Sequence, residues 1–160
     1  MGVTIQGIDK LAPALQQKAD RIVKAFLDDL DILGLKAVEY IRNRSAQESW
    51  MDQTGNLRSS IGYVVVRDGN IAIQGGFQQV SGPKRGESDK NGSKEGLSYA
   101  EELASRYSKG YALIVVAGME YAAYVEAHDN KDVLASGRKF LKKEVKRLVR
   151  DYKKAYTPKK

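Results

Sequence analysis

The stretch WMDQTGNLRSSIGYVVV, residues 50–66, lies where two different hydrophobic patterns meet. It contains the only tryptophan, Trp50, then the turn sequence Thr-Gly-Asn at residues 54–56, and then an apolar run. In a strand, neighbouring side chains of residues 61–66 would face opposite sides of a sheet. A helical pattern precedes this stretch and the other strand patterns follow it. We therefore interpret it as the junction between a helix and a sheet.

A long amphipathic helix is predicted before the junction, over residues 11–49. Apolar residues recur there at intervals of three or four, which is the period of one helical face: Leu15, Ala19, Ile22, Phe26, Leu30, Leu33, Ala37 and Tyr40. Gly34 is the position at which this helix would bend or divide. Asp28, Asp29 and Asp31 point in different directions on a helix, so they do not predict a metal site.

A β-hairpin is predicted after the junction, because Asp68-Gly69 separates two alternating runs, residues 61–66 and Asn70–Gly75. Asp-Gly readily adopts the positive φ angles of a two-residue hairpin turn, so the two runs should pair antiparallel. A third strand is predicted at Tyr111–Ala117 from its β-branched content. We expect Trp50 to be buried where the first helix meets this sheet.

Residues 78–97 are predicted to form a flexible loop, since they are rich in glycine and charge and nearly free of apolar groups. Such a loop is either a passive insertion or a segment that becomes ordered on contact with a neighbour. Ser98 and Glu101 have the spacing of a capping box, which predicts a helix over residues 99–108. Its inward residues would be Ala100, Leu103, Ala104 and Tyr107.

The last element predicted is a basic amphipathic helix over residues 133–156. Its apolar face consists of Leu134, Leu141, Val145, Leu148 and Tyr152. Residues 131–160 carry a net charge of +9, whereas the first 130 residues carry −2, so the total of +7 comes from the tail. A basic tail can contact nucleic acid or an acidic protein surface, and the simpler alternative is the solvated face of an amphipathic helix.

The composition excludes several classes of protein. There is no cysteine, so disulfides and thiolate metal sites are absent. The longest apolar run, Tyr111–Ala117, is far shorter than the roughly 20 residues of a membrane span. The first residues lack the apolar core of a secretory signal. We expect a single soluble domain made in the cytoplasm, without a membrane partner.

The one candidate for a catalytic residue is His128, which lies close to Glu126 and Asp129 in the sequence. A general base also needs a positioned nucleophile or water, and a metal site needs further ligands; the sequence identifies neither. A histidine in a turn is the simpler interpretation. We expect no enzyme and no cofactor, although a small hydrolase using His128 with Glu126 or Asp129 is a rival hypothesis.

Two motifs support a family resemblance. The first is Trp50 followed by TGNLRSSI at residues 54–61, and the second is YAAYVE at residues 121–126. In these motifs and in the order of its elements, the chain resembles the tail-completion or head–tail joining proteins of long-tailed double-stranded DNA phages, a kind of minor tail component. Members commonly follow the glutamate with glycine and a proline-containing stretch. Here Glu126 precedes Ala-His-Asp-Asn, and no proline occurs until Pro158.

The resemblance implies an α+β domain with a small, mainly antiparallel sheet packed against the long first helix and the last helix. It also implies a structural, ring-forming protein, six copies in the virion, docked to other phage neck or tail proteins around a channel that carries DNA. Non-specific contact with that DNA is expected, and no cofactor. The candidate subunit or partner contacts are Arg58, Tyr124, Glu126, Lys142, Lys146 and Lys153.

Two alternatives stay open at this point. For Arg58 and Glu126, the alternative is a helix cap or a local surface salt bridge, worth about 0–1 kcal/mol. For the whole chain, the alternative is a small basic nucleic-acid-binding protein that acts through its C-terminal helix.

Overall fold

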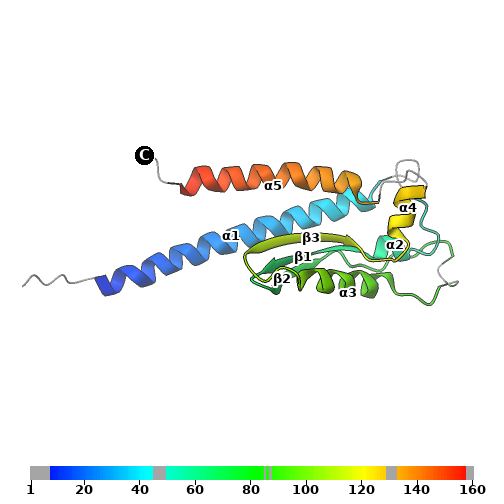
Figure 1. The fold of residues 1–160 in the computed structure, drawn as a ribbon, viewed down its shortest axis with the longest axis horizontal. Helices are drawn as coiled ribbons and strands as arrows, with labels where there is room; N and C mark the ends of the chain where they lie inside the picture. Colours follow the sequence, from blue (N-terminus) through cyan, green and yellow to red (C-terminus); the bar gives the residue numbers. More distant parts are fainter. Residues whose placement is uncertain (1–7, 45–49, 85, 87, 129–132, 158–160) are drawn as a thin grey trace, which may run out of the picture.

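The structure is a computed structural model, and it describes residues 8–44, 50–84, 86, 88–128 and 133–157. These residues form an α+β domain in which a small antiparallel sheet lies between helices (Figure 1). The α+β class expected from the sequence is confirmed. The elements in chain order are α1 (Ile8–Arg42), α2 (Asn56–Ser59), β1 (Ile61–Arg67), β2 (Asn70–Gly75), α3 (Gly92–Ala104), β3 (Tyr111–Ala117), α4 (Ala122–His128) and α5 (Ala135–Tyr156).

The sheet has the strand order β2-β1-β3, and both pairs are antiparallel. The predicted hairpin is confirmed: Asp68 and Gly69 form its turn with φ angles of 48° and 84°. A register shift between Val65 and Val66 marks a bulge in the pairing of β1 with β2. The order leaves β1 at the centre, whereas β2 and β3 are edge strands.

The alternation of β1 divides the core into two clusters, one on each face of the sheet. Ile61 and Val65 belong to the cluster that includes Val38 and Ile41 of α1. Val64 and Val66 belong to the cluster that includes Ala100 and Ala104 of α3. Thus α1 covers one face and α3 covers the other (Figure 1), and both sets of side chains are buried as the alternation predicts.

Helix α1 is continuous through Gly34, so it is not divided there. The ring of Tyr63 occupies the space in which a side chain at Gly34 would lie, and the Tyr63 hydroxyl donates a hydrogen bond to Asp31. The glycine therefore serves close packing between α1 and β1. The helix ends at Arg42, before the predicted residue 49; residues 45–49 lie outside the described residues.

Helix α3 begins at Gly92, so the loop predicted through residue 97 ends too late and the predicted cap at Ser98 is wrong. The cap is Asn91, whose side chain accepts a hydrogen bond from the Lys94 backbone N–H (3.2 Å). Gly92 and Gly96 are buried one turn apart, against the backbones of residues 56 and 60. Glycine disfavours helix, but the close approach of these backbones requires it here.

The inward face predicted for this helix is largely confirmed, because Ala100 and Ala104 are buried and Leu103 is half-buried. Tyr107 is the exception. It lies beyond the end of α3 with 48% of its surface exposed.

Helix α5 runs back along α1 and packs against it (Figure 1). Tyr40 of α1 stacks on Phe140 at a centroid distance of 5.7 Å, and Phe26 meets Tyr152 edge to face at 5.2 Å. Along the whole of α5, only Gly137 is fully buried. The predicted apolar face is thus present but only partly covered.

Candidate functional site

An open groove of about 1090 Å³ runs between α5, the edge strand β3 and the C-terminal end of α1. It brings together three of the six candidate contacts, Glu126, Lys142 and Lys146. Five apolar side chains form its floor: Ile41, Val115, Leu134, Leu141 and Val145. The remaining lining residues include Arg138 and Lys139. We call this site the α5–β3 groove.

The rim of the α5–β3 groove is basic. Arg138, Lys139, Lys142 and Lys146 are all exposed, and among the residues that the structure describes, Glu126 is the one acidic residue in the lining. Its Oε1 atom accepts hydrogen bonds from the backbone N–H groups of Leu134 (3.3 Å) and Ala135 (2.9 Å). Glu126 therefore caps the start of α5, where a negative charge is favourable. The four cations are exposed, and no other described residue adds a carboxylate to the lining.

Arg58 occupies a different place, inside the junction. Its guanidinium donates hydrogen bonds to the carbonyls of Arg42 and Trp50 (3.4 Å for Trp50) and lies 5.0 Å from the centre of the tryptophan ring. Arg42 in turn donates to the carbonyls of Arg58 (3.0 Å) and Ile61 (2.8 Å). Burial, and then the charge of Arg58, lower the pKa of Arg42. Arg58 thus ties the end of α1 to the junction.

Trp50 is 3% exposed and shares its buried cluster with Ile61 and Val65, so its predicted burial is confirmed. The two sequence motifs also meet near it. Burial and the charge of Asp52 raise the pKa of Tyr121, while a hydrogen bond with Thr54 opposes the rise. The motifs therefore form one structural unit.

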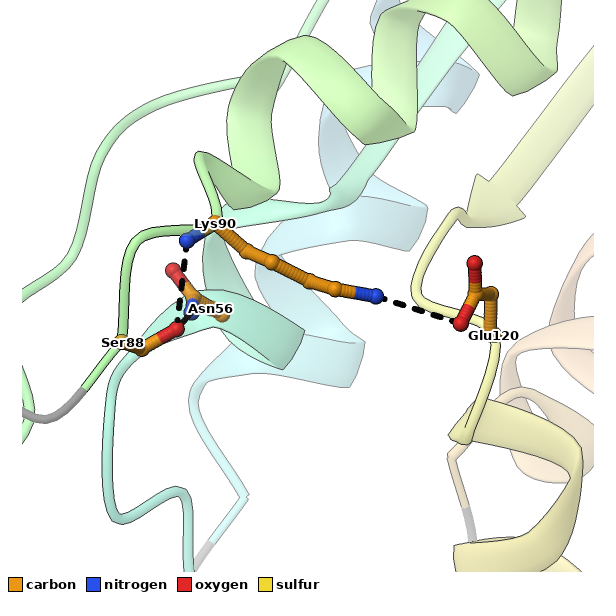
Figure 2. Close-up of polar contacts among 4 residues, drawn as sticks. All are labelled: Asn56, Ser88, Lys90 and Glu120. Atoms are coloured by element: carbon orange, nitrogen blue, oxygen red, sulfur yellow. Dashed lines mark hydrogen bonds and ion pairs between the residues drawn. The ribbon is translucent and has the colours of Figure 1, made fainter.

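Buried polar residues of the first motif hold the segment that precedes α3. Asn56 donates through Nδ2 to Oγ of Ser88 (2.7 Å), which also accepts from the backbone N–H of Lys90 (3.3 Å), as Figure 2 shows. Lys90 reaches Glu120 with a separation of 3.1 Å between its Nζ and a carboxylate oxygen. This segment packs on its own domain, although its composition suggests that it cannot.

A second attachment lies earlier in the segment. The buried Oγ of Ser59 accepts a hydrogen bond from the backbone N–H of Val80 (2.7 Å) and donates one to the carbonyl of Gly55 (2.6 Å). Val80 also lies against Gly55, where a side chain would find no room. The motif residues thus act as anchors for the chain around them.

The other candidates lie apart from the groove lining. Tyr124 is on α4 with 60% of its surface exposed, and Lys153 is exposed near the end of α5. The side chain of His128 and all of Asp129 lie outside the described residues. The hydrolase hypothesis therefore stays a prediction.

The clustered acidic residues 28, 29 and 31 of α1 have structural partners. Asp28 forms an ion pair with Lys24 (2.7 Å), and Asp29 accepts a hydrogen bond from the Tyr152 hydroxyl (2.8 Å). Among the described residues, no three acidic or histidine side chains are placed to hold a metal ion. Within the same residues, no helix has the length and hydropathy needed to cross a membrane.

The groove joins elements far apart in the sequence, so sequence reasoning identifies some of its residues without identifying the site. Lys142 and Lys146 are candidates because the last helix is basic, whereas Val115 is expected only as part of the third strand. The uncharged sequence of β3 and the apolar stripe on α5 indicate the two elements that form the walls of the groove. Neither signal indicates that these walls adjoin. In comparisons with known proteins, no family model, curated protein or solved structure matches the chain.

Proposed function

We propose that this chain is a structural subunit of a phage or prophage particle, a ring-forming tail-completion or head–tail connector protein. The N-terminal part of α1 carries this proposal. Residues 9–21 are all exposed, and Leu11 and Leu15 are 56% and 58% exposed. This part of the helix extends past the sheet, beyond the rest of the domain (Figure 1).

A projecting helix of this kind is typical of an assembly part. Residues 9–21 span roughly 20 Å of helix, and most of the stability of helices in proteins comes from packing of their apolar face. Burying a leucine fully stabilises by about 1.5–3 kcal/mol, so packing Leu11 and Leu15 against a neighbour would stabilise this segment. A contact between two different surfaces of identical subunits closes into a ring when the rotation permits.

The kind of assembly follows from the sequence motifs. Their resemblance to tail-completion proteins supports a ring of six copies between head and tail, docked to other neck or tail proteins. The exposed cations of α5 suit a position beside DNA or an acidic neighbour. The proposed location is the virion, after synthesis in the host cytoplasm.

Electron microscopy of particles tests the proposal. In the genome that encodes the chain, deleting its gene should yield filled heads separated from tails, and the intact gene supplied in trans should restore joined particles. The pair Leu11→Lys and Leu15→Lys should fail to restore them, while Tyr107→Lys, a change at an exposed tyrosine outside α1, should succeed. Intact particles after deletion would overturn the proposal. Capsid, portal or tail-tube genes are expected beside this gene.

A nucleic-acid-binding function is the second candidate, and the surface of α5 favours it. Its exposed cations are Arg138, Lys139, Lys142, Lys143, Lys146, Arg147, Arg150, Lys153 and Lys154. A free DNA-binding protein would bind duplex DNA as an isolated monomer, with an affinity that falls steeply with salt. The test is to titrate the chain, verified by mass as a monomer, with duplex DNA at two salt concentrations. Tight binding that weakens steeply with salt would favour this candidate over the ring-forming subunit.

A further inference from the structure

One side of β3 is an open hydrogen-bonding edge. The Gly118 N–H donates to the Ser60 carbonyl, and the Asp68 N–H donates to the Gly110 carbonyl. These two bonds identify the hydrogen-bonded residue pairs just beyond the two ends of the strand. Because these pairs alternate in an antiparallel ladder, even-numbered residues of β3 bond to β1. Leu113 and Val115 therefore direct their N–H and C=O groups away from β1. Among the described residues, none pairs with these groups.

The α5–β3 groove lies along this edge. Val115 contributes to its floor, and Leu141 and Val145 of α5 line the same space. A strand added to β3 would lie about 4.8 Å beyond it and would direct alternate side chains towards these half-buried residues. Strand β3, with the sequence YALIVVA, contains neither the charge nor the proline that commonly protects an edge strand.

The charges of the groove indicate the chemistry of the added segment. Four exposed cations stand at the rim, and Glu126 is already engaged at the start of α5. Another copy could offer its own edge strand β2, but the sequence of β2, NIAIQG, has no acidic residue to meet this rim. An apolar segment flanked by acidic residues complements both the floor and the rim.

We propose that an extended segment of a partner protein, apolar and flanked by acidic residues, joins the sheet beside β3 as a new strand beneath α5. Main-chain hydrogen bonds to Leu113 and Val115 would bind it, and the groove would select its side chains. This inference rests on the proposed function, because it takes the partner to be a neighbouring virion protein. The binding itself does not require a ring.

A designed peptide tests the docking. The probe is Asp-Glu-Val-Thr-Val-Thr-Val-Glu-Asp, and the control peptide has lysine at each acidic position. The full-length chain should bind the probe, with binding at least about tenfold tighter than that of the control, because the rim repels cations. Amide exchange resolved by NMR should slow at Leu113 and Val115 when the probe binds, while Ile114, already paired with β1, should change little.

Charge reversal shows whether the rim selects the segment. Lys142→Glu with Lys146→Glu should weaken probe binding about tenfold or more, because two favourable charges become repulsive. The matched control is Lys94→Glu with Lys109→Glu, which changes the net charge equally at exposed positions outside the groove lining. It should bind the probe like the unmodified chain. All four lysines are exposed, so both variants should remain folded.

Several outcomes would overturn the inference. Equal weakening by both double variants would show that the probe senses only net charge. Binding without slower exchange at Leu113 and Val115 would show that no strand is added. Protection of these amides that rises with protein concentration alone would assign the edge to a second copy. The mass of the assembly, measured on the same samples, tests the proposed ring separately from peptide binding. A ring can form without peptide binding, and peptide binding can occur without a ring.

Discussion

The junction around Trp50 and the α5–β3 groove use polar groups in opposite ways. At the junction, Asn56 and Ser59 are buried, and their side chains form hydrogen bonds within the chain. In the groove, the cations of α5 are exposed above an apolar floor. The residues that carry the sequence resemblance therefore hold the fold together. Apart from Glu126 of the second motif, the residues that form the surface open to a partner lie outside the motifs and are brought together only by folding.

Removing the tryptophan should break the junction most severely. Trp50→Ala is expected to lower the free energy of unfolding by about 3–5 kcal/mol, because a large side chain leaves a buried cluster. Met51→Ala is the control, since its neighbouring side chain is 73% exposed and should change stability by less than about 0.5 kcal/mol. Urea unfolding measures both. A loss below about 1 kcal/mol for Trp50→Ala would contradict its role in the core.

A methyl group added to the packed side of α3 should have the next largest effect. In Gly96→Ala, the new Cβ would meet the backbone of Ser60, so either α3 or the turn before β1 must shift. We expect a loss of about 1–3 kcal/mol. Gly86→Ala provides the control, because nothing lies within 4 Å of a Cβ at that position. Equal stabilities of the two variants in urea would show that α3 does not need its glycines.

Substitutions of Glu126 measure how much its cap stabilises the start of α5 at the edge of the groove. Glu126→Ala removes the acceptor for the N–H groups of Leu134 and Ala135 and should cost about 1 kcal/mol. Glu126→Gln keeps an acceptor and should cost less. Thermal unfolding of both variants measures the difference. If glutamine and alanine cost the same, the charge rather than the hydrogen bond stabilises the start of α5.

The smallest expected effect is a pH dependence where α5 packs on α1. Burial, and then the hydrogen bond to Asp29, raise the pKa of Tyr152 from 10.0 to about 12. A raised pKa means that the folded chain holds the proton more tightly. The contribution of Tyr152 is therefore complete below pH 10 and declines as the pH rises through about 12.

Tyr152→Phe removes this titrating group. The stability difference between the unmodified chain and the variant should shrink between neutral pH and about pH 11. Unfolding in urea at both pH values measures it, and the shared titration of other groups, including Tyr63, cancels in the comparison. A difference that stays constant with pH would show that the hydrogen bond to Asp29 does not stabilise the helix pair.

Much of the fold could be predicted from local patterns. The alternation in β1, the Asp68-Gly69 turn and the apolar stripes of α1 and α5 each depend on the residues of one segment, and the structure has all four. Burial of Trp50 could be predicted too, because a lone tryptophan between two apolar patterns has a large surface to bury. Such features are determined by the sequence itself, since neighbours along the chain set both the backbone preference and the face that is apolar.

The tertiary structure decided the features that depend on distant backbones. Gly92 and Gly96 look like loop residues, but they lie in a helix, at positions where the backbones of residues 56 and 60 approach too closely for side chains. Gly34 likewise lies within a continuous helix, at a position where the ring of Tyr63 fills the space of a side chain. The groove likewise exists only because α5 packs on α1 beside β3. Local propensity contains no information about which surfaces will meet, and that is why the candidate site emerged only from the fold.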